Sequence, residues 1–425
     1  MKKLIYLLLT AAVLGSSAFV CNTRHVQQTG SAFSTTGDLT MLASDAMEGR
    51  GVGTEAERRA GAYIAQRFQS IGLQPKGDTS WFQPFTFVPH GALQVHHVGD
   101  SAALGMALVK EINGRNVIGF LDNGAANTII IGAHYDHLGW GDENSLWTGE
   151  RAIHNGADDN ASGTSALIQL AAWLTQKPKG TASNNYLFIA FSGEEKGLWG
   201  SNHFCKNPTV DLKKVNYMLN MDMVGRLNAE KKLAINGVGT STHWMKILPD
   251  IKADGIQIVT SESGVGPSDH TSFYLMDIPV LHFFTGQHAD YHKPTDDTDK
   301  INFAGIESVM KYMRELILRT DAKGKIDFQK TKDDTQQKSS FKVTLGVMPD
   351  YMHSGPGMRI DGVSEGKTAH TAGIIKGDIV TRIGDHEVNG MEDYMNALNQ
   401  FEKGQSAKVT VLRNGEEMVF DVVWK

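Results

Sequence analysis

Between residues 116 and 319, short apolar runs rich in β-branched residues alternate with segments whose apolar residues recur every three or four positions. The first pattern predicts buried strands, and the second predicts helices. Strands that alternate with helices are typical of the α/β class, with a mostly parallel sheet and helices on both faces. The expected strands are residues 116–121, 128–133, 185–191, 215–221, 256–260 and 278–284, and the expected helices are residues 164–174 and 303–319 and a segment from residue 197.

One helix before this region is predicted from its terminal signals. Thr54 and Glu57 have the spacing of a capping box, in which both side chains bind free amide groups at a helix start. Gly72 is a typical residue just after a helix end. The apolar face between these signals consists of Ala60, Tyr63, Ile64, Phe68 and Ile71.

The composition changes after the last predicted helix, and this change predicts a second domain. Residues 321–340 are polar and charged with few apolar side chains, as is typical of a linker. Residues 341–425 return to short strands with turn signals, and Arg413-Asn414-Gly415-Glu416 is a hairpin candidate. We therefore expect a large domain over residues 38–320 and a small β-rich domain over residues 341–425.

The first residues have the order of an export signal. Two lysines at positions 2 and 3 precede an apolar run from Leu4 to Leu14, and small residues follow at positions 16–18. This order predicts a signal peptide over residues 1–20. The apolar run falls short of the ~20 residues that a transmembrane helix needs. The protein is expected to be exported, to the periplasm or the extracellular space.

The cysteines leave two outcomes for the mature N-terminus. A lipid on Cys21 would anchor the protein to the membrane. Val20 before it favours simple cleavage instead, because lipoprotein signals usually have a small residue at that position. In either case Cys205 has no intramolecular partner, so disulfides do not hold this fold together.

The composition describes an ordinary globular protein, with 41% hydrophobic and 21% charged residues. The formal net charge is −6, and the basic residues are scattered along the chain. Nucleic acid is therefore not an expected partner.

Side chains that bind metal ions follow the ends of the predicted strands. Open α/β sheets bind their ligands outside the carboxyl ends of the strands. Nitrogen and oxygen ligands without cysteine favour an open, catalytic zinc site over a structural one. The candidates at strand ends are His134, Glu194, Glu195, Asp222 and His292, and Asp159 precedes the helix at residues 164–174.

Asp159 is the candidate around which the others are organised. It lies in Asn155-Gly156-Ala157-Asp158-Asp159-Asn160-Ala161-Ser162-Gly163. A carboxylate has two oxygens, so one Asp can bind an ion with each and hold the pair at the roughly 3.5–4 Å separation of two-metal hydrolysis. The same stretch is also compatible with a polar loop that makes local turns before the helix.

The ordered set of motifs resembles a known family. Its members here are His134-Tyr135-Asp136-His137-Leu138-Gly139, Gly156-Ala157-Asp158-Asp159-Asn160-Ala161-Ser162-Gly163, Gly193-Glu194-Glu195, Asn220-Met221-Asp222-Met223 and Tyr291-His292. They resemble the co-catalytic di-zinc aminopeptidases of the bacterial leucyl aminopeptidase and aminopeptidase Y type. The resemblance runs from about Leu39 to Arg319, including Glu48-Gly49-Arg50-Gly51, and implies the zinc exopeptidase fold.

The resemblance implies two zinc ions per chain. One zinc would be held by His134, Asp159 and Asp222. The other would be held by Asp159, Glu195 and His292, so that Asp159 bridges the pair.

The resemblance also implies roles for residues that do not bind the metal. Asp136 would fix the ring orientation of His134, as outer carboxylates commonly do. Glu194 would be the general base, and Tyr291 would donate a hydrogen bond to the scissile carbonyl. Members of the family usually have a cis peptide after the bridging Asp, which here is Asp159–Asn160.

The C-terminal region resembles a PDZ domain. The motifs are Thr344-Leu345-Gly346-Val347, Asp361-Gly362-Val363, Ala372-Gly373-Ile374 and Gly377-Asp378-Ile379-Val380. The resemblance implies a loop that binds a peptide's terminal carboxylate, and a groove beside the helix at residues 391–401 where the peptide adds as a strand. The alternative is a packing module that binds no peptide.

Together these patterns favour an exported, zinc-dependent aminopeptidase that hydrolyses N-terminal residues from peptides through a two-zinc-activated water. The alternatives are a carboxypeptidase, a glutaminyl-cyclase-like enzyme on the same fold, and a non-catalytic peptide-binding scaffold. The full two-zinc set disfavours the cyclase, a family that works with one zinc. The intact Glu194 disfavours the scaffold, which has no need of a general base.

Overall fold

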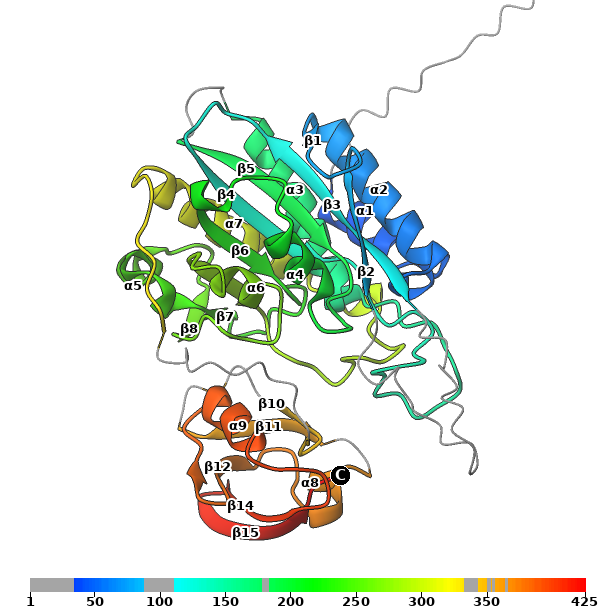
Figure 1. Ribbon diagram of the computed structural model, residues 1–425, viewed down its shortest axis with the longest axis vertical. Coiled ribbons are helices and arrows are strands. Elements are labelled where there is room, and N and C mark those ends of the chain that lie inside the picture. Colours follow the sequence, from blue (N-terminus) through cyan, green and yellow to red (C-terminus); the bar gives the residue numbers. More distant parts are fainter. Residues whose placement is uncertain are drawn as a thin grey trace, which may run out of the picture. The chain divides into compact units, whose positions relative to one another are not determined.

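The computed structural model describes residues 34–87, 111–177, 183–331, 343–349, 353, 356–363 and 366–425. These residues form two sheets, one of nine strands and one of six (Figure 1). The predicted signal peptide, Cys21 and residues 332–340 of the predicted linker lie outside the described residues. No helix in the described part of the chain is long and apolar enough to cross a membrane.

The large sheet is parallel in its middle and antiparallel toward both sides. Its strand order is β1-β3-β5-β4-β6-β9-β7-β8, with β2 paired to β3. The four strands β5, β4, β6 and β9 run parallel, whereas β3 and β7 pair with this group in the antiparallel sense. The strands are β1 (Gln74–Pro75), β2 (Phe82–Phe87), β3 (Ile112–Leu121), β4 (Asn127–His134), β5 (Asn184–Phe191), β6 (Val215–Met221), β7 (Lys232–Asn236), β8 (Gln257–Ser261) and β9 (Val280–Phe284).

Helices cover both faces of this sheet (Figure 1). On β4, Ile129 and Ile131 belong to one hydrophobic cluster and Ile130 belongs to another, because successive side chains of a strand point to opposite faces. The first cluster includes residues of α1, α2, α3, α5 and α7, and the second includes residues of α4 and α6. The helices are α1 (Thr35–Leu42), α2 (Glu55–Ile71), α3 (Gly163–Thr175), α4 (Trp199–Lys206), α5 (Thr242–Ile247), α6 (His270–Tyr274) and α7 (Phe303–Asp321).

The signals at the ends of α2 act as the sequence predicts. The Thr54 hydroxyl oxygen accepts a hydrogen bond from the Glu57 backbone N–H at 3.3 Å. Gly72 follows the helix with φ +91°, a left-handed conformation that suits glycine. Short 3-10 helices occur at Asp45–Arg50, Leu212–Lys214, Val238–Thr240, Leu248–Asp250 and Thr298–Lys300.

The C-terminal domain has its own sheet and its own hydrophobic core. Its strand order is β10-β11-β12-β14-β15, with β13 paired to β12. The predicted hairpin turn joins β14 to β15, with Asn414 at φ +54° and Gly415 at φ +87°, as a two-residue type I′ turn requires. The elements are β10 (Val347–Pro349), β11 (Met358–Val363), α8 (Thr368–Ala372), β12 (Ile379–Ile383), β13 (His386–Glu387), α9 (Met391–Leu398), β14 (Ser406–Arg413) and β15 (Glu416–Val423).

The first part of the predicted linker differs from the expectation. Residues 324–331 pack on the large domain instead of leading away from it. Ile326 is buried in the large core, and the Asp327 carboxylate accepts hydrogen bonds from Ser241 and Thr242 at the start of α5. The Thr331 backbone N–H donates to the Tyr274 hydroxyl at 3.0 Å. The large domain therefore extends to Thr331, because this polar stretch satisfies its backbone groups on a neighbouring surface.

Candidate metal centre

The carboxyl ends of three neighbouring strands bring candidate ligands to one edge of the large sheet. His134 is the last residue of β4, and Asp222 directly follows β6. Glu194 and Glu195 lie just beyond Phe191, where β5 ends. Because β5, β4 and β6 are adjacent and parallel, these ends meet at the same edge.

Asp159 reaches this edge from the turn Ala157–Ser162, which precedes α3. The Asp296 carboxylate holds the turn, since its Oδ2 accepts hydrogen bonds from the backbone N–H groups of Asp158 and Asp159, both at 3.0 Å. The Asp158 side chain bonds elsewhere, to the backbone after β6. The peptide bond between Asp159 and Asn160 is cis, as the family resemblance implies.

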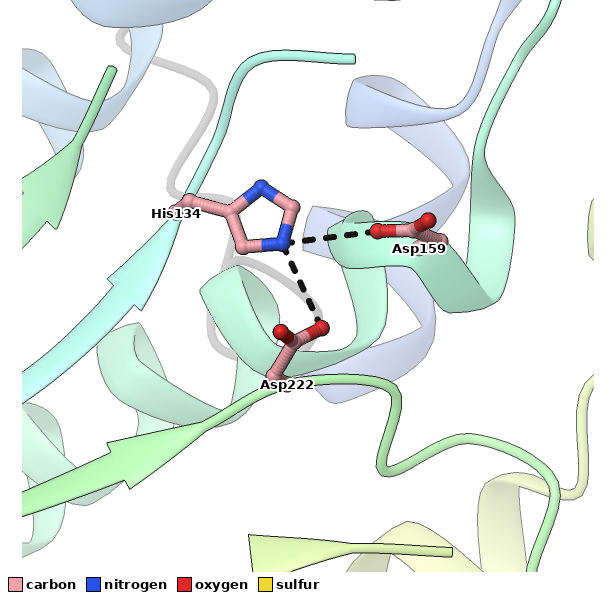
Figure 2. Close-up of side chains that lie close together, drawn as sticks. All are labelled: His134, Asp159 and Asp222. Atoms are coloured by element: carbon pink, nitrogen blue, oxygen red, sulfur yellow. Dashed lines mark hydrogen bonds and ion pairs between the residues drawn. The ribbon is translucent and has the colours of Figure 1, made fainter. Parts of the chain in front are cut away.

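The first group of ligands consists of His134, Asp159 and Asp222. Both carboxylates point toward the same ring nitrogen (Figure 2). The His134 Nε2 atom lies 3.4 Å from Asp159 Oδ1 and 3.3 Å from Asp222 Oδ1. The structure thus brings together the three residues that were expected to share one ion.

The second group gathers around the other oxygen of Asp159. His292 Nε2 lies 3.3 Å from Asp159 Oδ2 and 3.1 Å from Glu195 Oε2. His137 also enters this group, with its Nδ1 atom 2.7 Å from Glu195 Oε1 and 3.9 Å from Asp159 Oδ2. Four side chains therefore surround the second position, one more than the sequence predicts.

The spacing of these atoms fits metal ligation. Tetrahedral zinc with bonds of about 2.0–2.2 Å places neighbouring ligand atoms about 3.3–3.6 Å apart. The distances from His134 to both aspartates, 3.3 and 3.4 Å, match this spacing, and His292 lies 3.1 and 3.3 Å from its two carboxylates. The 2.7 Å distance from His137 to Glu195 is instead that of a hydrogen bond.

Backbone carbonyls orient the two principal histidine rings. His134 Nδ1 lies 3.2 Å from the Asp136 carbonyl oxygen, and His292 Nδ1 lies 2.9 Å from the Asn144 carbonyl oxygen. A ring N–H that donates to a carbonyl leaves Nε2 as the free lone pair for a metal ion. The predicted partner of His134, the Asp136 carboxylate, is farther away at 3.8 Å. It accepts instead from the Glu194 backbone N–H at 3.2 Å, so that Asp136 also fixes the chain at Glu194.

The two adjacent glutamates have opposite electrostatic surroundings. Loss of surrounding water raises the pKa of Glu194 well above its usual range, against the opposing charge of His134. Burial also acts to raise the pKa of Glu195, but His292 and His137 outweigh it and hold that pKa well below its usual range. These surroundings favour the charged form of Glu195 and the protonated form of Glu194.

A cavity of about 210 Å³ opens beside both ligand groups. Its apolar wall contains Met223, Pro267, Phe284 and Tyr291. The Tyr291 ring stacks on His292 with ring centroids 3.8 Å apart, so this residue lies beside the second group as the sequence predicts.

Two residues at the centre received no role from sequence reasoning. His137 was part of a quoted motif, but its spacing from His134 did not reveal that its ring turns toward Glu195. Arg50 was likewise quoted only as part of a motif. Its guanidinium is fully buried and donates to the carbonyls of Tyr135, Asn155 and Gly156, beside the ligands.

The structure is an α/β protein with a carboxylate–histidine cluster that is a candidate metal centre. Residues 116–317 match the model of peptidase family M28, and residues 324–423 match the model of the PDZ domain. The large domain is thus similar to peptidase family M28, and the C-terminal domain is similar to PDZ domains.

Similar proteins cover this chain in part. A probable leucine aminopeptidase of Arthroderma otae is 30% identical over 39% of this chain and 45% of its own length. Aminopeptidase YwaD of Bacillus subtilis is 29% identical over 41% of this chain and 37% of its own length. The chain spans less than half the length of these relatives.

Solved structures share the fold. A zinc aminopeptidase from Bacillus subtilis superposes with a TM-score of 0.53 at 18% identity, over 70% of this chain and 99% of its own. A Zn-dependent exopeptidase from Parabacteroides distasonis gives 0.52 at 17% identity, over 67% and 96%. A glutaminyl cyclase from Porphyromonas gingivalis gives 0.50 at 17% identity, over 67% and 97%.

Proposed function

We propose that the protein is a zinc-dependent aminopeptidase that removes N-terminal residues from peptides at a centre of two metal ions. The observation that carries this proposal is the position of Asp159. Its Oδ1 faces His134 at 3.4 Å, and its Oδ2 faces His292 at 3.3 Å. One carboxylate that presents each oxygen to a different histidine is the arrangement that bridges two ions.

The distances support the ligand sets that the family resemblance implies. His134, Asp159 and Asp222 would hold one zinc, and Asp159, Glu195 and His292 the other. His137 would donate a hydrogen bond to Glu195 and keep this carboxylate in place. Two zinc ions would supply a bound water of lowered pKa and positive charge opposite a developing oxyanion.

The protein's own groups supply the proton transfer and the orientation of the substrate. Glu194 accepts a proton from the attacking water at its carboxylate and returns it to the leaving amine. Burial raises the pKa of this carboxyl group in the metal-free state, and nearby cations would lower it again. Tyr291, beside His292, would donate a hydrogen bond to the scissile carbonyl.

The charge of the cavity favours the amino end of a peptide. Among the described residues that line it, there are six carboxylate or histidine side chains, four of them proposed metal ligands, and no Lys or Arg. A carboxypeptidase needs a cation to pair with the terminal carboxylate, whereas a protonated or neutral amine fits an acidic wall. The apolar wall then suits an uncharged first side chain.

The test uses purified protein and three versions of one peptide. A free peptide and its C-amide should lose residues from the N-terminus, whereas the N-acetylated peptide should resist. Metal analysis should give two zinc ions per chain, and chelation should abolish release of amino acids. Cleavage of the acetylated peptide from its C-terminus would establish a carboxypeptidase, and loss of ammonia from a peptide with N-terminal Gln would establish a cyclase.

We also propose that the protein is exported and that its PDZ domain binds an extended peptide. The leader at residues 1–20 supports export, and its test is sequencing and mass analysis of the mature N-terminus, where a diacylated Cys21 would show lipidation. Peptide binding is supported by β10, which lies at the edge of the small sheet beside the loop at residues 344–347. Titration with C-terminal and C-amidated peptides tests it, because carboxylate recognition requires the free C-terminus.

A further inference from the structure

Arg50 makes contacts that no step of the proposed hydrolysis uses. Its side chain has no exposed surface, a burial reached by no other Lys or Arg in the described part of the chain. The guanidinium donates four hydrogen bonds, and all four acceptors are backbone carbonyls. Nε donates to Tyr135 at 2.7 Å, Nη1 donates to Leu42 at 2.6 Å and Asn155 at 2.7 Å, and Nη2 donates to Gly156 at 3.0 Å.

Three of these carbonyls belong to the two segments that carry the proposed ligands His134 and Asp159, and the fourth, that of Leu42, is at the end of α1. Tyr135 directly follows His134, and Gly156 directly precedes the turn Ala157–Ser162. The backbone at Arg50 adds to this connection, because its carbonyl accepts from the His137 N–H at 3.3 Å. One residue therefore ties the end of β4 to the turn before α3.

The backbone conformation of Arg50 also depends on its surroundings. Its φ is +50°, in the left-handed region that residues other than glycine rarely adopt. Such a conformation persists where surrounding contacts determine it, and it clusters at functional sites. The four hydrogen bonds of the guanidinium are the contacts that hold it here.

The charge of Arg50 acts on the site without occupying it. No carboxylate among the described residues forms an ion pair with it, yet Asp159, Asp136, Asp296 and Glu195 all favour its charged form. Burial lowers its pKa to about 10, which leaves the group charged at neutral pH. If the Arg50 guanidinium formed an ion pair with a ligand carboxylate, it would occupy oxygens that a metal ion needs. Because its partners are backbone carbonyls, those carboxylate oxygens stay free.

We propose that Arg50 is a positioning residue that assembles the ligand set before the metal binds. The inference rests on the proposed function, because it presumes that the centre holds zinc. Hydrogen bonds from a charged donor are stronger than those between neutral groups, and the four from Arg50 add to the bond from the Thr164 hydroxyl to the His134 carbonyl at 2.8 Å, which joins the same two segments. Loss of outer contacts to metal ligands typically lowers metal affinity ~10–100-fold.

A role of Arg50 through its charge and a role through positioning predict opposite changes in zinc affinity, so the proposal can be tested. A positive charge near the centre repels a metal cation, so a role through charge alone means that its removal tightens zinc binding. A role in positioning means that loss of the four-carbonyl geometry weakens zinc binding even where the charge is kept. Arg50→Lys keeps the charge and loses the planar fork of donors, and Arg50→Met loses both.

The experiment measures zinc affinity of the full chain by competition with a chromophoric chelator, and the absorption spectrum of the cobalt-substituted protein. Arg50→Lys should bind zinc at least ten-fold more weakly and give an altered cobalt spectrum. Arg67→Met is the matched control, because Arg67 is also buried but pairs with Asp38 away from the ligands. It should lower thermal stability and leave zinc affinity unchanged.

Each outcome decides between the possibilities. Wild-type zinc affinity in Arg50→Lys, or tighter binding in Arg50→Met, overturns the proposal. Equal losses of affinity in the Arg50 variants and in Arg67→Met also overturn it, since general destabilisation would explain them. If Arg50→Met does not fold, Arg50→Lys alone decides. A wild-type protein that binds no zinc refutes the proposed function instead, and so the two failures are distinguishable.

Discussion

Glu194 and Glu195 are neighbours in sequence, but their surroundings suit different proposed roles, a general base for Glu194 and a metal ligand for Glu195. Hydrogen bonds and opposite charges hold Glu195 ionised against His292 and His137, whereas Glu194 faces the cavity with a raised pKa. Glu194→Gln should therefore retain two zinc ions and lower kcat by ~10²–10⁴-fold, the typical contribution of a positioned general base. Glu195→Gln should lose one zinc ion per chain. Metal analysis and steady-state kinetics on the same preparations measure both effects.

The opposite pattern would exchange the two roles. That pattern is zinc loss in Glu194→Gln with a metal-replete but inert Glu195→Gln. Full metal and full activity in both variants would remove both residues from the site.

His137 and His292 both approach Glu195, and their distances separate a ligand from a supporting residue. His292 lies at ligand spacing from Asp159 and Glu195, whereas His137 forms a 2.7 Å hydrogen bond. His292→Ala should therefore abolish binding of the second zinc. His137→Ala should keep two zinc ions at saturation and weaken the second by ~10–100-fold, as loss of an outer hydrogen bond to a ligand does.

Isothermal titration of the metal-free variants with zinc distinguishes these effects by stoichiometry and affinity. His243→Ala is a control, because His243 lies on α5 and bonds Thr320 rather than a ligand. A stoichiometry of one for His137→Ala and two for His292→Ala would make His137 the ligand.

Helices and strands with a long, regular apolar pattern could be predicted from the sequence, whereas several short ones could not. The strands of the parallel group and the helices α2, α3 and α7 were predicted because each carries a long apolar pattern or clear caps. The five-residue strand β7 and helix α6 and the short α1 were missed, since their apolar residues are too few to define a period. The antiparallel pairing of β3 with β5 and of β7 with β9 was also missed, because the direction of pairing depends on contacts between residues distant in sequence.

The same limit applies at the site. Motif order predicted which side chains lie together, because strand ends place them at one edge of the sheet whatever the details of the loops. The turn of His137 toward Glu195 and the four bonds of Arg50 depend on how three loops pack together. No local pattern encodes such packing.

The segment at residues 324–331 predicts a difference between two shortened proteins. A protein that ends at Thr331 keeps Ile326 in the core and Asp327 at the start of α5, whereas one that ends at Asp321 loses both. Burial of one Ile side chain is worth about 1.5–3 kcal/mol. The longer form should unfold with a free energy at least ~1.5 kcal/mol greater, while both bind two zinc ions, since no proposed ligand lies beyond His292.

Denaturant unfolding of the two forms measures this difference. Equal stabilities would mean that residues 324–331 add nothing to the large domain. Loss of zinc from the form that ends at Thr331 would mean that the PDZ domain takes part in the metal centre.

In the whole molecule without metal, three buried carboxyl groups have raised pKa values. Burial raises the pKa of Asp136 to about 8, of Asp269 to about 7 and of Asp296 to about 6, against a usual value of 3.8. Between about pH 4 and 8 these three carboxyl groups therefore bind more protons in the folded metal-free protein than in the unfolded chain. Stability changes with pH in proportion to the protons bound by the unfolded state minus those bound by the folded state, so the contribution of these three groups falls as pH rises. Buried His270 and His282, whose pKa values are lowered, oppose this trend only below the usual histidine pKa of 6.5.

Zinc and protons compete for this centre, so the stabilisation by zinc should grow over the same range. Glu195 and Asp222 have lowered pKa values, so their contributions to stability are lost only at lower pH. They therefore do not change the fall in stability between pH 5.5 and pH 8. We expect the thermal midpoint of the EDTA-treated protein to fall between pH 5.5 and pH 8, and the gap to the zinc-loaded protein to widen. Both forms are compared at each pH, which cancels the titration of groups outside the centre. A gap that stays constant or narrows would mean that the buried carboxyl groups are ionised in the metal-free protein and are balanced by charges such as Arg50.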